Sequence, residues 1–327
     1  MLCCPDKFRG SLTAPDAAAA MRRGVERAGL DARALPLADG GEGTLDAILD
    51  ASPGTLRHTW VTGPDGAPVD AAWGLLDDGT AVIEMARASG LALVRHNDPL
   101  TATTYGTGEL IGAALDAGSH RIVVGVGGSA TVDGGLGALE ALGWSLRGAE
   151  VVVACDVTTV FLDAPRLFGP QKGASPGAVS ELEERLCALS PRLEETFGVE
   201  VLELPGGGAA GGLAGGLAAA GARLVPGFDV VAEAVGFEDA LASCTAVVTG
   251  EGKVDATTLD GKVVVRVLEA AAASGRPAAV VAGVVDPGVE LGVPTRALAD
   301  MADDPFREAA SLLERATTAL VRELVPC

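Results

Sequence analysis

Short runs of β-branched residues alternate with alanine-rich stretches along almost the whole chain of 327 residues. Runs such as 121–126 and 278–285 have the composition of buried strands, and the stretches between them have that of helices. Strands that alternate with helices form parallel sheets, because each helix carries the chain back to the starting edge of the sheet. The alternation therefore predicts an α/β protein with a mainly parallel sheet, in two domains or one large one.

The alternation is interrupted between residues 56 and 84. Apolar runs at 56–62, 69–76 and 80–84 are joined there by two turns that contain Asp-Gly, which predicts an antiparallel meander. A doubly wound domain would not contain such a meander, so we expect a second domain. We predict a discontinuous first domain at 1–55 and 245–327, an inserted mixed α/β domain at 56–244, and an active site in the cleft between them.

Composition excludes several classes of function. The net charge of −20 and an aromatic content of 3% argue against a nucleic-acid-binding protein. No stretch is apolar enough for a good membrane span, so we expect no membrane partner. The six cysteines have no metal-ligand spacing and predict reduced thiols in a cytoplasmic protein.

Lysine is rare and its positions are informative. The chain has 20 arginines but only four lysines, each in a glycine-flanked loop or at the start of a helix: Lys7, Lys172, Lys253 and Lys262. Such compact ammonium groups suit contacts with phosphate or carboxylate oxygens. The alternative is that chance and surface placement account for all four.

Acidic residues follow the predicted strands. They are Asp6, Asp39 with Glu42, Asp133, Asp156, Glu251 and Asp255. Ligands bind at the carboxyl ends of strands in open α/β sheets, and acids mixed with lysines and glycines suit an anionic ligand bound with Mg²⁺. The alternative is that single aspartates cap helices, a role that is about equally plausible for Asp133.

Other chemistries find little support. The histidines lie outside the glycine clusters, no catalytic triad can be built, and no Walker-type phosphate-binding motif is present. Gly206, Gly208 and Gly211 match the dinucleotide fingerprint GxGxxG after an apolar run at 199–204, with Asp229 further on. In so glycine-rich a segment this pattern arises easily by chance, so an NAD-dependent hydroxyacid dehydrogenase is an alternative of another class.

Several long and unusual motifs extend over nearly the whole chain. The first two are Pro5-Asp6-Lys7-Phe8-Arg9-Gly10-Ser11 and Ala38-Asp39-Gly40-Gly41-Glu42-Gly43-Thr44. Others lie at 83–86, 105–110, 127–131, 133–135, 154–157, 168–174, 205–212, 249–255 and 261–262. In this order they resemble the motifs of one family of bacterial glycerate kinases.

The resemblance implies ATP-dependent, Mg²⁺-dependent phosphorylation of D-glycerate, to 2-phosphoglycerate rather than the alternative 3-phosphoglycerate. It also implies one flavodoxin-like domain with a parallel sheet and one mixed-sheet domain like a restriction-endonuclease core. We expect a monomer or a homodimer.

The charges and the resemblance together give the expected site. The expected catalytic residues are Asp39, Asp133, Lys172 and Lys253, and the expected metal ligands are Asp156 and Asp255. The residues expected to bind substrate or ATP are Asp6, Lys7, Arg9, Ser11, Gly40, Gly41, Glu42, Gly127, Gly128, Ser129, Thr131, Gln171, Gly250, Glu251 and Lys262.

Three features depart from the family pattern. Val132 stands where the family usually has Asn, the segment between Trp144 and Glu150 is much shorter than usual, and residues 158–167 replace a different loop beside Asp156. These departures leave substrate specificity open, and a non-catalytic small-anion sensor is a further alternative.

Overall fold

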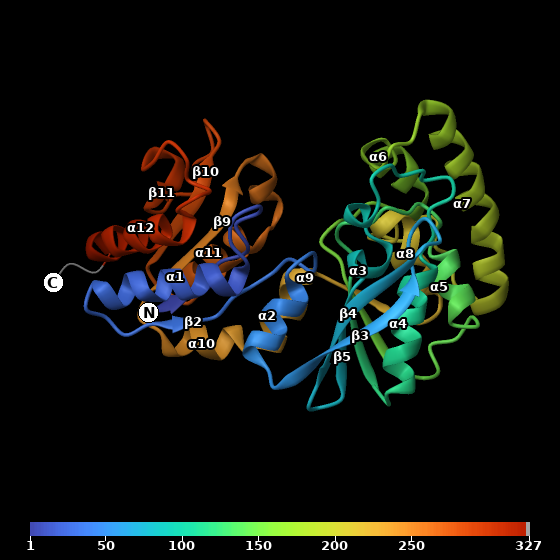
Figure 1. The fold of residues 1–327 in the computed structure, drawn as a ribbon, viewed down its shortest axis with the longest axis horizontal. Helices are drawn as coiled ribbons and strands as arrows, with labels where there is room; N and C mark the ends of the chain where they lie inside the picture. The colour runs from blue at the N-terminus through green and yellow to red at the C-terminus, as the bar shows by residue number, and fades with distance from the viewer. Residues whose placement is uncertain (325–327) are drawn as a thin grey trace. The chain divides into compact units, whose positions relative to one another are not determined.

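Residues 1–324 are described by the structure, a computed structural model (Figure 1). They form two compact units: the first contains residues 1–39, 46–52 and 231–324, and the second contains residues 40–45 and 53–230. The expected boundaries were at 55/56 and 244/245, whereas here residues 231–244 group with the first unit. One contact that holds them there is the hydrogen bond from Ser52 Oγ to the carbonyl of Ala234, at 3.2 Å.

The first unit contains a five-stranded, fully parallel sheet. Its strands are β1 (Leu2–Cys3), β2 (Arg33–Ala34), β9 (Val247–Val254), β10 (Ala278–Val285) and β11 (Thr295–Ala297). They lie in the order β2-β1-β9-β10-β11. Counted along the chain within this unit, the order is 2-1-3-4-5, that of flavodoxin-like folds. The expectation of a flavodoxin-like parallel sheet is therefore confirmed.

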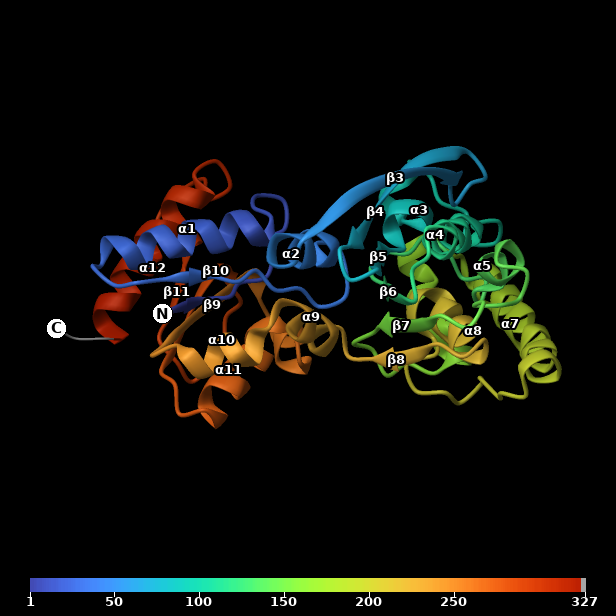
Figure 2. The same cartoon turned by 90° about the horizontal axis from the view of Figure 1, so that it is seen from below.

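Helices cover both faces of this sheet, as Figure 2 shows. One face carries α1 (Ala14–Arg27) and α12 (Ala309–Leu324), and the other carries α10 (Phe237–Ser243) and α11 (Val263–Ala273). Successive side chains of β10 point to opposite faces of the sheet and join the core on each face. Val281 packs with Met21 of α1, and Val280 packs with Val264 of α11.

Helix α1 begins where its sequence predicts. Thr13 is the N-cap, and its hydroxyl accepts a hydrogen bond from the backbone N–H of Asp16 at 3.2 Å. Near the end of α1, Gly24 lies against α12: a Cβ atom there would be 2.5 Å from the carbonyl oxygen of Glu314 and 2.7 Å from Cβ of Thr317. The two helices therefore pack closely because this position has no side chain.

The second unit contains a six-stranded mixed sheet. Its strands, in spatial order, are β3 (Gly54–Thr62), β4 (Pro68–Leu76), β5 (Thr80–Glu84), β6 (Arg121–Gly125), β7 (Glu150–Ala154) and β8 (Arg223–Val225). Strands β3 to β5 are the expected antiparallel meander, and β5 to β8 are parallel to one another. The predicted mixed sheet is therefore confirmed.

Helices pack on this sheet in layers. They are α3 (Ala86–Ser89), α4 (Tyr105–Asp116), α5 (Leu136–Ala141), α6 (Ala164–Phe168), α7 (Pro176–Phe197), α8 (Leu213–Ala219) and the first residues of α9 (Gly227–Val235), whose later residues group with the first unit. Helices α4, α5 and α8 share the main core with the sheet, and α7 packs outside them through a separate core around Phe161. On the opposite face, Val230 of α9 packs against Val152.

Four segments differ from what their local sequence suggests. The segment 250–253 is not a loop, because β9 continues through it and pairs with β10. The run 33–37 forms a strand of only two residues. The apolar run 199–204 forms no strand, and the last helix begins at Ala309 although Asp304-Pro305 is a typical helix start.

The structure also describes the cysteines and the apolar character of the helices. The five described cysteines form no disulfide, and Cys327 lies outside the described residues. Within residues 1–324, no helix has the length and apolar character needed to span a bilayer.

Two helical glycines give a matched test of the packing. Gly24→Ala should lower the free energy of unfolding by about 1–3 kcal/mol, because its methyl group overlaps α12. Gly112→Ala, in α4 with nothing within 4 Å of its Cβ position, should raise it by about 0.5–1 kcal/mol through helix propensity. Urea unfolding of both variants checks this, and equal effects would contradict the close α1–α12 contact.

Candidate functional site

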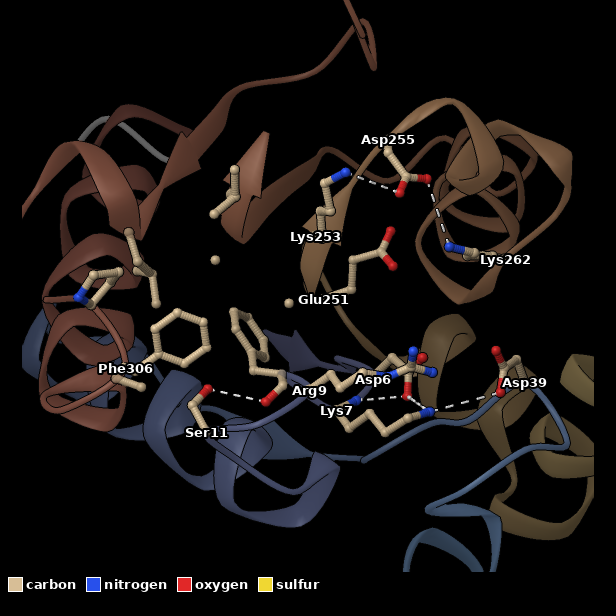
Figure 3. A pocket seen from close by; sticks show the side chains of 17 residues that line it. Asp6, Lys7, Arg9, Ser11, Asp39, Glu251, Lys253, Asp255, Lys262 and Phe306 are labelled. Carbon is tan, nitrogen blue, oxygen red and sulfur yellow. Dashed lines mark hydrogen bonds and ion pairs between the residues drawn. The ribbon is translucent and has the colours of Figure 1, made fainter. Parts of the chain in front are cut away.

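A cavity of about 420 Å³ lies in the first unit, at the carboxyl ends of β1 and β9 (Figure 3). These neighbouring strands are where the order of the sheet reverses, with β2 on one side and β10 and β11 on the other. Ligands of open α/β sheets bind at such a position. Of the expected site residues, nine line the cavity: Asp6, Lys7, Arg9, Ser11, Asp39, Glu251, Lys253, Asp255 and Lys262.

Acidic side chains gather on one side of this cavity. Asp6 accepts a hydrogen bond from the backbone N–H of Lys7 at 2.6 Å, and the Lys7 ammonium lies 3.6 Å from Asp6 and 3.9 Å from Asp39. Burial, helped by the charges of Asp39 and Glu251 and opposed by Lys7, raises the pKa of Asp6 to about 7. On this side of the cavity, the acidic side chains therefore outnumber the single lysine, Lys7, that lies beside them.

Glu251 is the inward-facing acid of β9. Its carboxylate accepts a hydrogen bond from the hydroxyl of Thr258 at 2.7 Å. Burial raises the pKa of Glu251, and the nearby charges of Asp255 and Asp39 add to this effect. A cation beside Asp39 and Glu251 would relieve this repulsion.

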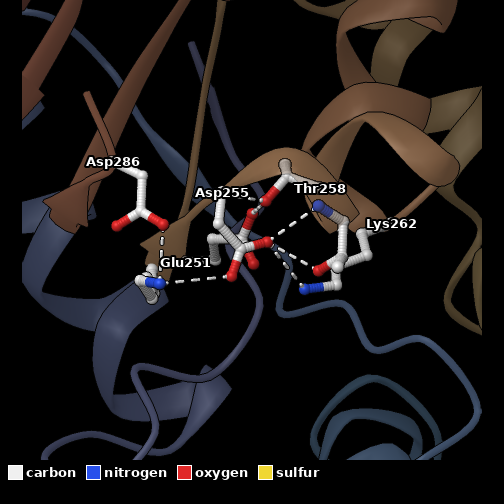
Figure 4. Close-up of polar contacts among 7 residues, drawn as sticks. Glu251, Asp255, Thr258, Lys262 and Asp286 are labelled. Atoms are coloured by element: carbon white, nitrogen blue, oxygen red, sulfur yellow. Dashed lines mark hydrogen bonds and ion pairs between the residues drawn. The ribbon is translucent and has the colours of Figure 1, made fainter. Parts of the chain in front are cut away.

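Two lysines surround Asp255 on another side of the cavity (Figure 4). The Lys253 ammonium lies 3.5 Å from the Asp255 carboxylate and 2.7 Å from that of Asp286, and the Lys262 ammonium lies 3.8 Å from Asp255. The hydrogen bond from the Thr257 hydroxyl, followed by the two lysines, lowers the pKa of Asp255 to about 2. Asp255 thus stays ionised and holds both ammonium groups at the cavity.

Glycines in β9 let the chain approach closely at this point. A Cβ atom on Gly250 would lie 2.0 Å from the carbonyl oxygen of Val281, and one on Gly252 would lie 2.8 Å from the backbone nitrogen of Arg9. Gly250, expected to bind the ligand, is instead packed within the sheet and is not among the residues that line the cavity. Gly252 allows the segment that carries Arg9 to lie against β9.

In the second unit, the glycine-rich loop 40–45 lies on the carboxyl ends of β6 and β7. A Cβ atom on Gly40 would meet Ala154 at 2.9 Å, and one on Gly127 would meet the Cα atom of Gly41 at 2.7 Å. Buried Glu84 fixes the loop by accepting hydrogen bonds from the backbone N–H groups of Gly43 and Leu45, at 2.8 and 3.0 Å. We did not predict Glu84 as a site residue, although a carboxylate that ends an apolar strand is a usable signal.

Lys172 is buried, with only 4% of its surface exposed. Its ammonium donates to the hydroxyl of Ser129 at 2.7 Å and to the carbonyl oxygen of Thr131 at 2.8 Å. Burial lowers the pKa of Lys172 to about 7, and the negative charge of Asp133 opposes that shift. The structure thus brings Lys172, Ser129 and Thr131, all three predicted as site residues, together near the carboxyl end of β6.

Asp133 is engaged by four hydrogen bonds. One oxygen accepts from the N–H and the hydroxyl of Thr104, both at 2.8 Å, and from the N–H of Gly137 at 3.3 Å, while the other accepts from the N–H of Gly135 at 3.1 Å. These contacts join the starts of α4 and α5. The geometry therefore supports the helix-capping alternative for Asp133.

The other expected residues of the second unit are dispersed. Asp156, expected to bind metal, accepts a hydrogen bond from the N–H of Gly227 at 2.7 Å, at the start of α9. Glu42, Gly128 and Gln171 are exposed. Within residues 1–324, no group of three or more His, Cys, Asp or Glu side chains is arranged to hold a metal ion.

The glycines of the GxGxxG segment have a packing role. A Cβ atom on Gly211 would lie 2.0 Å from the carbonyl oxygen of Thr131, and one on Gly208 would lie 2.4 Å from the carbonyl oxygen of Val160. The segment also follows no strand, so it does not form the strand–turn–helix unit that binds a dinucleotide.

Comparison with known proteins gives a consistent result. The sequence profile of the "Glycerate kinase family" matches residues 1–150 and 145–324. The two matches meet at residues 145–150, the segment that is shorter here than is usual in the family.

Individual relatives extend over most of the chain. It is 40% identical to "Glycerate 2-kinase" of Escherichia coli (strain K12), over 85% of this chain and 84% of that protein. It is 39% identical to "Glycerate kinase" of Bacillus subtilis (strain 168), over 96% and 95%. A crystal structure from Salmonella typhimurium LT2, provisionally assigned as glycerate kinase 2, superposes with a TM-score of 0.85 at 34% identity, covering 99% of this chain and 97% of that one.

The burial of Lys172 has a measurable consequence for stability. The folded protein releases this proton near pH 7, whereas the unfolded chain keeps it up to the ordinary pKa of 10.5. Between these values the unfolded state binds more protons, so stability rises with pH. Relative to Lys172→Met, the wild type should gain up to about 1.4 kcal/mol per pH unit between pH 7 and 10.

Urea unfolding of both proteins at pH 7, 8.5 and 10 measures this gain. The difference between the two proteins cancels the titration of every other group. A difference that stays constant with pH would show that the Lys172 ammonium is not desolvated.

Proposed function

The chain belongs to the glycerate kinase family, and on this basis we propose that it transfers the γ-phosphoryl group of ATP to the 2-hydroxyl group of D-glycerate. The products are 2-phosphoglycerate and ADP. The name of the Escherichia coli relative, a glycerate 2-kinase, supports phosphorylation at the 2-position.

One observation of the structure carries this proposal. Four acidic and four basic side chains converge on a single cavity at the switch point of the parallel sheet: Asp6, Lys7, Arg9, Asp39, Glu251, Lys253, Asp255 and Lys262. Enzymes catalyse phosphoryl transfer mainly by positioning the reactants and by neutralising charge on the phosphate oxygens. A cavity with closely spaced charges of both signs is suited to that task.

Cationic side chains would hold the phosphate oxygens. Lys253 and Lys262 are kept at the cavity by Asp255, and their ammonium groups can each donate to a phosphate oxygen. Arg9 lines the same cavity and can bind two oxygens through its planar guanidinium group. These contacts strengthen as charge develops on the transferring group and on the leaving ADP.

Asp6 is the residue that we propose as general base. In the reaction, the glycerate hydroxyl oxygen forms a bond to the γ-phosphorus, and the bond between that phosphorus and the β–γ bridging oxygen breaks. The hydroxyl proton passes to the Asp6 carboxylate, while the bridging oxygen leaves with ADP. A pKa of about 7 suits this role, because the group can both accept and release a proton near neutral pH.

The acidic side of the cavity fits Mg²⁺. This ion takes one or two protein carboxylates together with phosphate oxygens and water. Asp39 and Glu251 supply two carboxylates whose mutual repulsion a cation would relieve. When bound, the ion would neutralise phosphate charge. Asp255 suits the ion less because two lysines already accompany it, and Asp156 belongs to the other unit.

Lys172 and Asp133 have different proposed roles. The Lys172 ammonium has three donors, and two of them hydrogen-bond Ser129 and Thr131. The third donor suits an anionic oxygen, such as that of a carboxylate or a phosphate. Asp133 is proposed as a positioning residue for α4 and α5, since both of its oxygens already accept backbone hydrogen bonds.

The two alternative functions are less well supported. A dehydrogenase would need the GxGxxG segment to bind NAD, and the close backbone packing of Gly211 on Thr131 opposes that. A small-anion sensor would need no base or metal ligands, yet the cavity contains candidates for both. A cytoplasmic location, where ATP is abundant and thiols stay reduced, agrees with the kinase proposal.

Phosphorus NMR tests the proposed reaction. Protein incubated with ATP, Mg²⁺ and D-glycerate should give ADP and 2-phosphoglycerate in equal amounts, and EDTA should abolish the reaction. A 3-phosphoglycerate signal would contradict the position of transfer, and no turnover with either glycerate isomer would contradict the function. NADH absorbance in the same preparation tests the dehydrogenase alternative.

A further inference from the structure

The cavity of the first unit has a second, apolar half that the chemistry above does not use. Its lining residues are Phe8, Val284, Leu298, Pro305, Phe306 and Ala309. Figure 3 shows Phe306 on the side of the cavity opposite Lys253, Asp255 and Lys262. The cavity is therefore divided into a charged half and an apolar half.

Phe306 is unusual because it is both aromatic and exposed. Its exposed fraction is 63%, whereas Phe8, Leu298 and Ala309, which line the same cavity, are 1%, 1% and 5% exposed. Helix α12 begins only at Ala309. Phe306 therefore lies in the segment before this helix, and that segment places its side chain at the cavity.

The two substrates differ in whether they could use an apolar surface. Glycerate is a three-carbon hydroxy acid in which every carbon carries oxygen, so it has no apolar face. ATP carries a planar aromatic base joined through ribose to a chain of phosphates. Only ATP therefore matches a cavity that is apolar at one end and charged at the other.

We infer that this cavity is the nucleotide site, with the base of ATP against Phe306 and the triphosphate directed toward Lys253 and Lys262. The inference rests on the proposed kinase function for the identity of the nucleotide. Stacking of a base on an aromatic ring contributes measurably to affinity and depends on the exposed ring face. Phe306 would be a binding residue that acts on ATP and not on glycerate.

Calorimetric titration with two ligands isolates the contribution of the base. ATP carries the base, whereas inorganic tripolyphosphate carries only the charged chain. For Phe306→Ala in the presence of Mg²⁺, the Kd of ATP should rise about 5- to 30-fold, and the Kd of tripolyphosphate should change less than twofold. Phe306→Tyr should keep the wild-type affinity for both ligands.

A matched control is Trp60→Ala, which removes an aromatic side chain of 72% exposure from β3 in the other unit. It should leave both affinities unchanged. In steady-state assays, Phe306→Ala should raise the KM for ATP by a similar factor and leave kcat and the KM for D-glycerate within twofold.

Three results would overturn the base site: equal affinity of the wild type for ATP and tripolyphosphate, an unchanged Kd for ATP in the folded Phe306→Ala variant, or a rise confined to the KM for D-glycerate. A wild type that binds ATP in a Phe306-dependent way but phosphorylates no glycerate would support the base site and overturn the proposed function.

Discussion

The parallel pairing of β1 with β9 is the contact on which the rest of the site depends. Leu2 pairs with Val247 and Cys3 with Val248, and the hydroxyl of Thr249 donates to the carbonyl oxygen of Cys4 at 2.8 Å. This pairing brings the start of the chain beside a strand from its last third. The pairing also sets the positions of Asp6 and Glu251, because each lies three residues after a member of the pair Cys3–Val248.

Much of the fold could be predicted because it follows from local patterns. The Asp-Gly turns specified the meander, and the alternation of strands and helices specified the parallel sheets. The strand ends also indicated acidic side chains that line the cavity, since every parallel strand ends at the same edge of its sheet. The position of Phe306 at the cavity could not be predicted in this way, because the exposure of its side chain depends on where α12 begins.

The sequence could not decide whether its glycines lie against a ligand or against the protein's own backbone. Gly40 and Gly250 are expected from the sequence to bind substrate or ATP, and Gly211 matches a dinucleotide fingerprint, yet each of the three lies against another segment of backbone. A missing side chain permits close approach by a ligand or by protein, and sequence does not distinguish the two. For the same reason a glycine-rich turn suggested catalysis for Asp133, whose carboxylate also accepts backbone hydrogen bonds at the starts of α4 and α5.

The central claim is that the carboxylates at the β1–β9 switch point carry out the chemistry. The most direct measurement is kcat for Asp6→Asn, with Asp50→Asn, an exposed position on α2 (Thr44–Ala51), as the control. The account predicts that Asp6→Asn lowers kcat by about 100-fold or more while both KM values change less than threefold, and that Asp50→Asn has no effect. A folded Asp6→Asn enzyme with the wild-type kcat would contradict it.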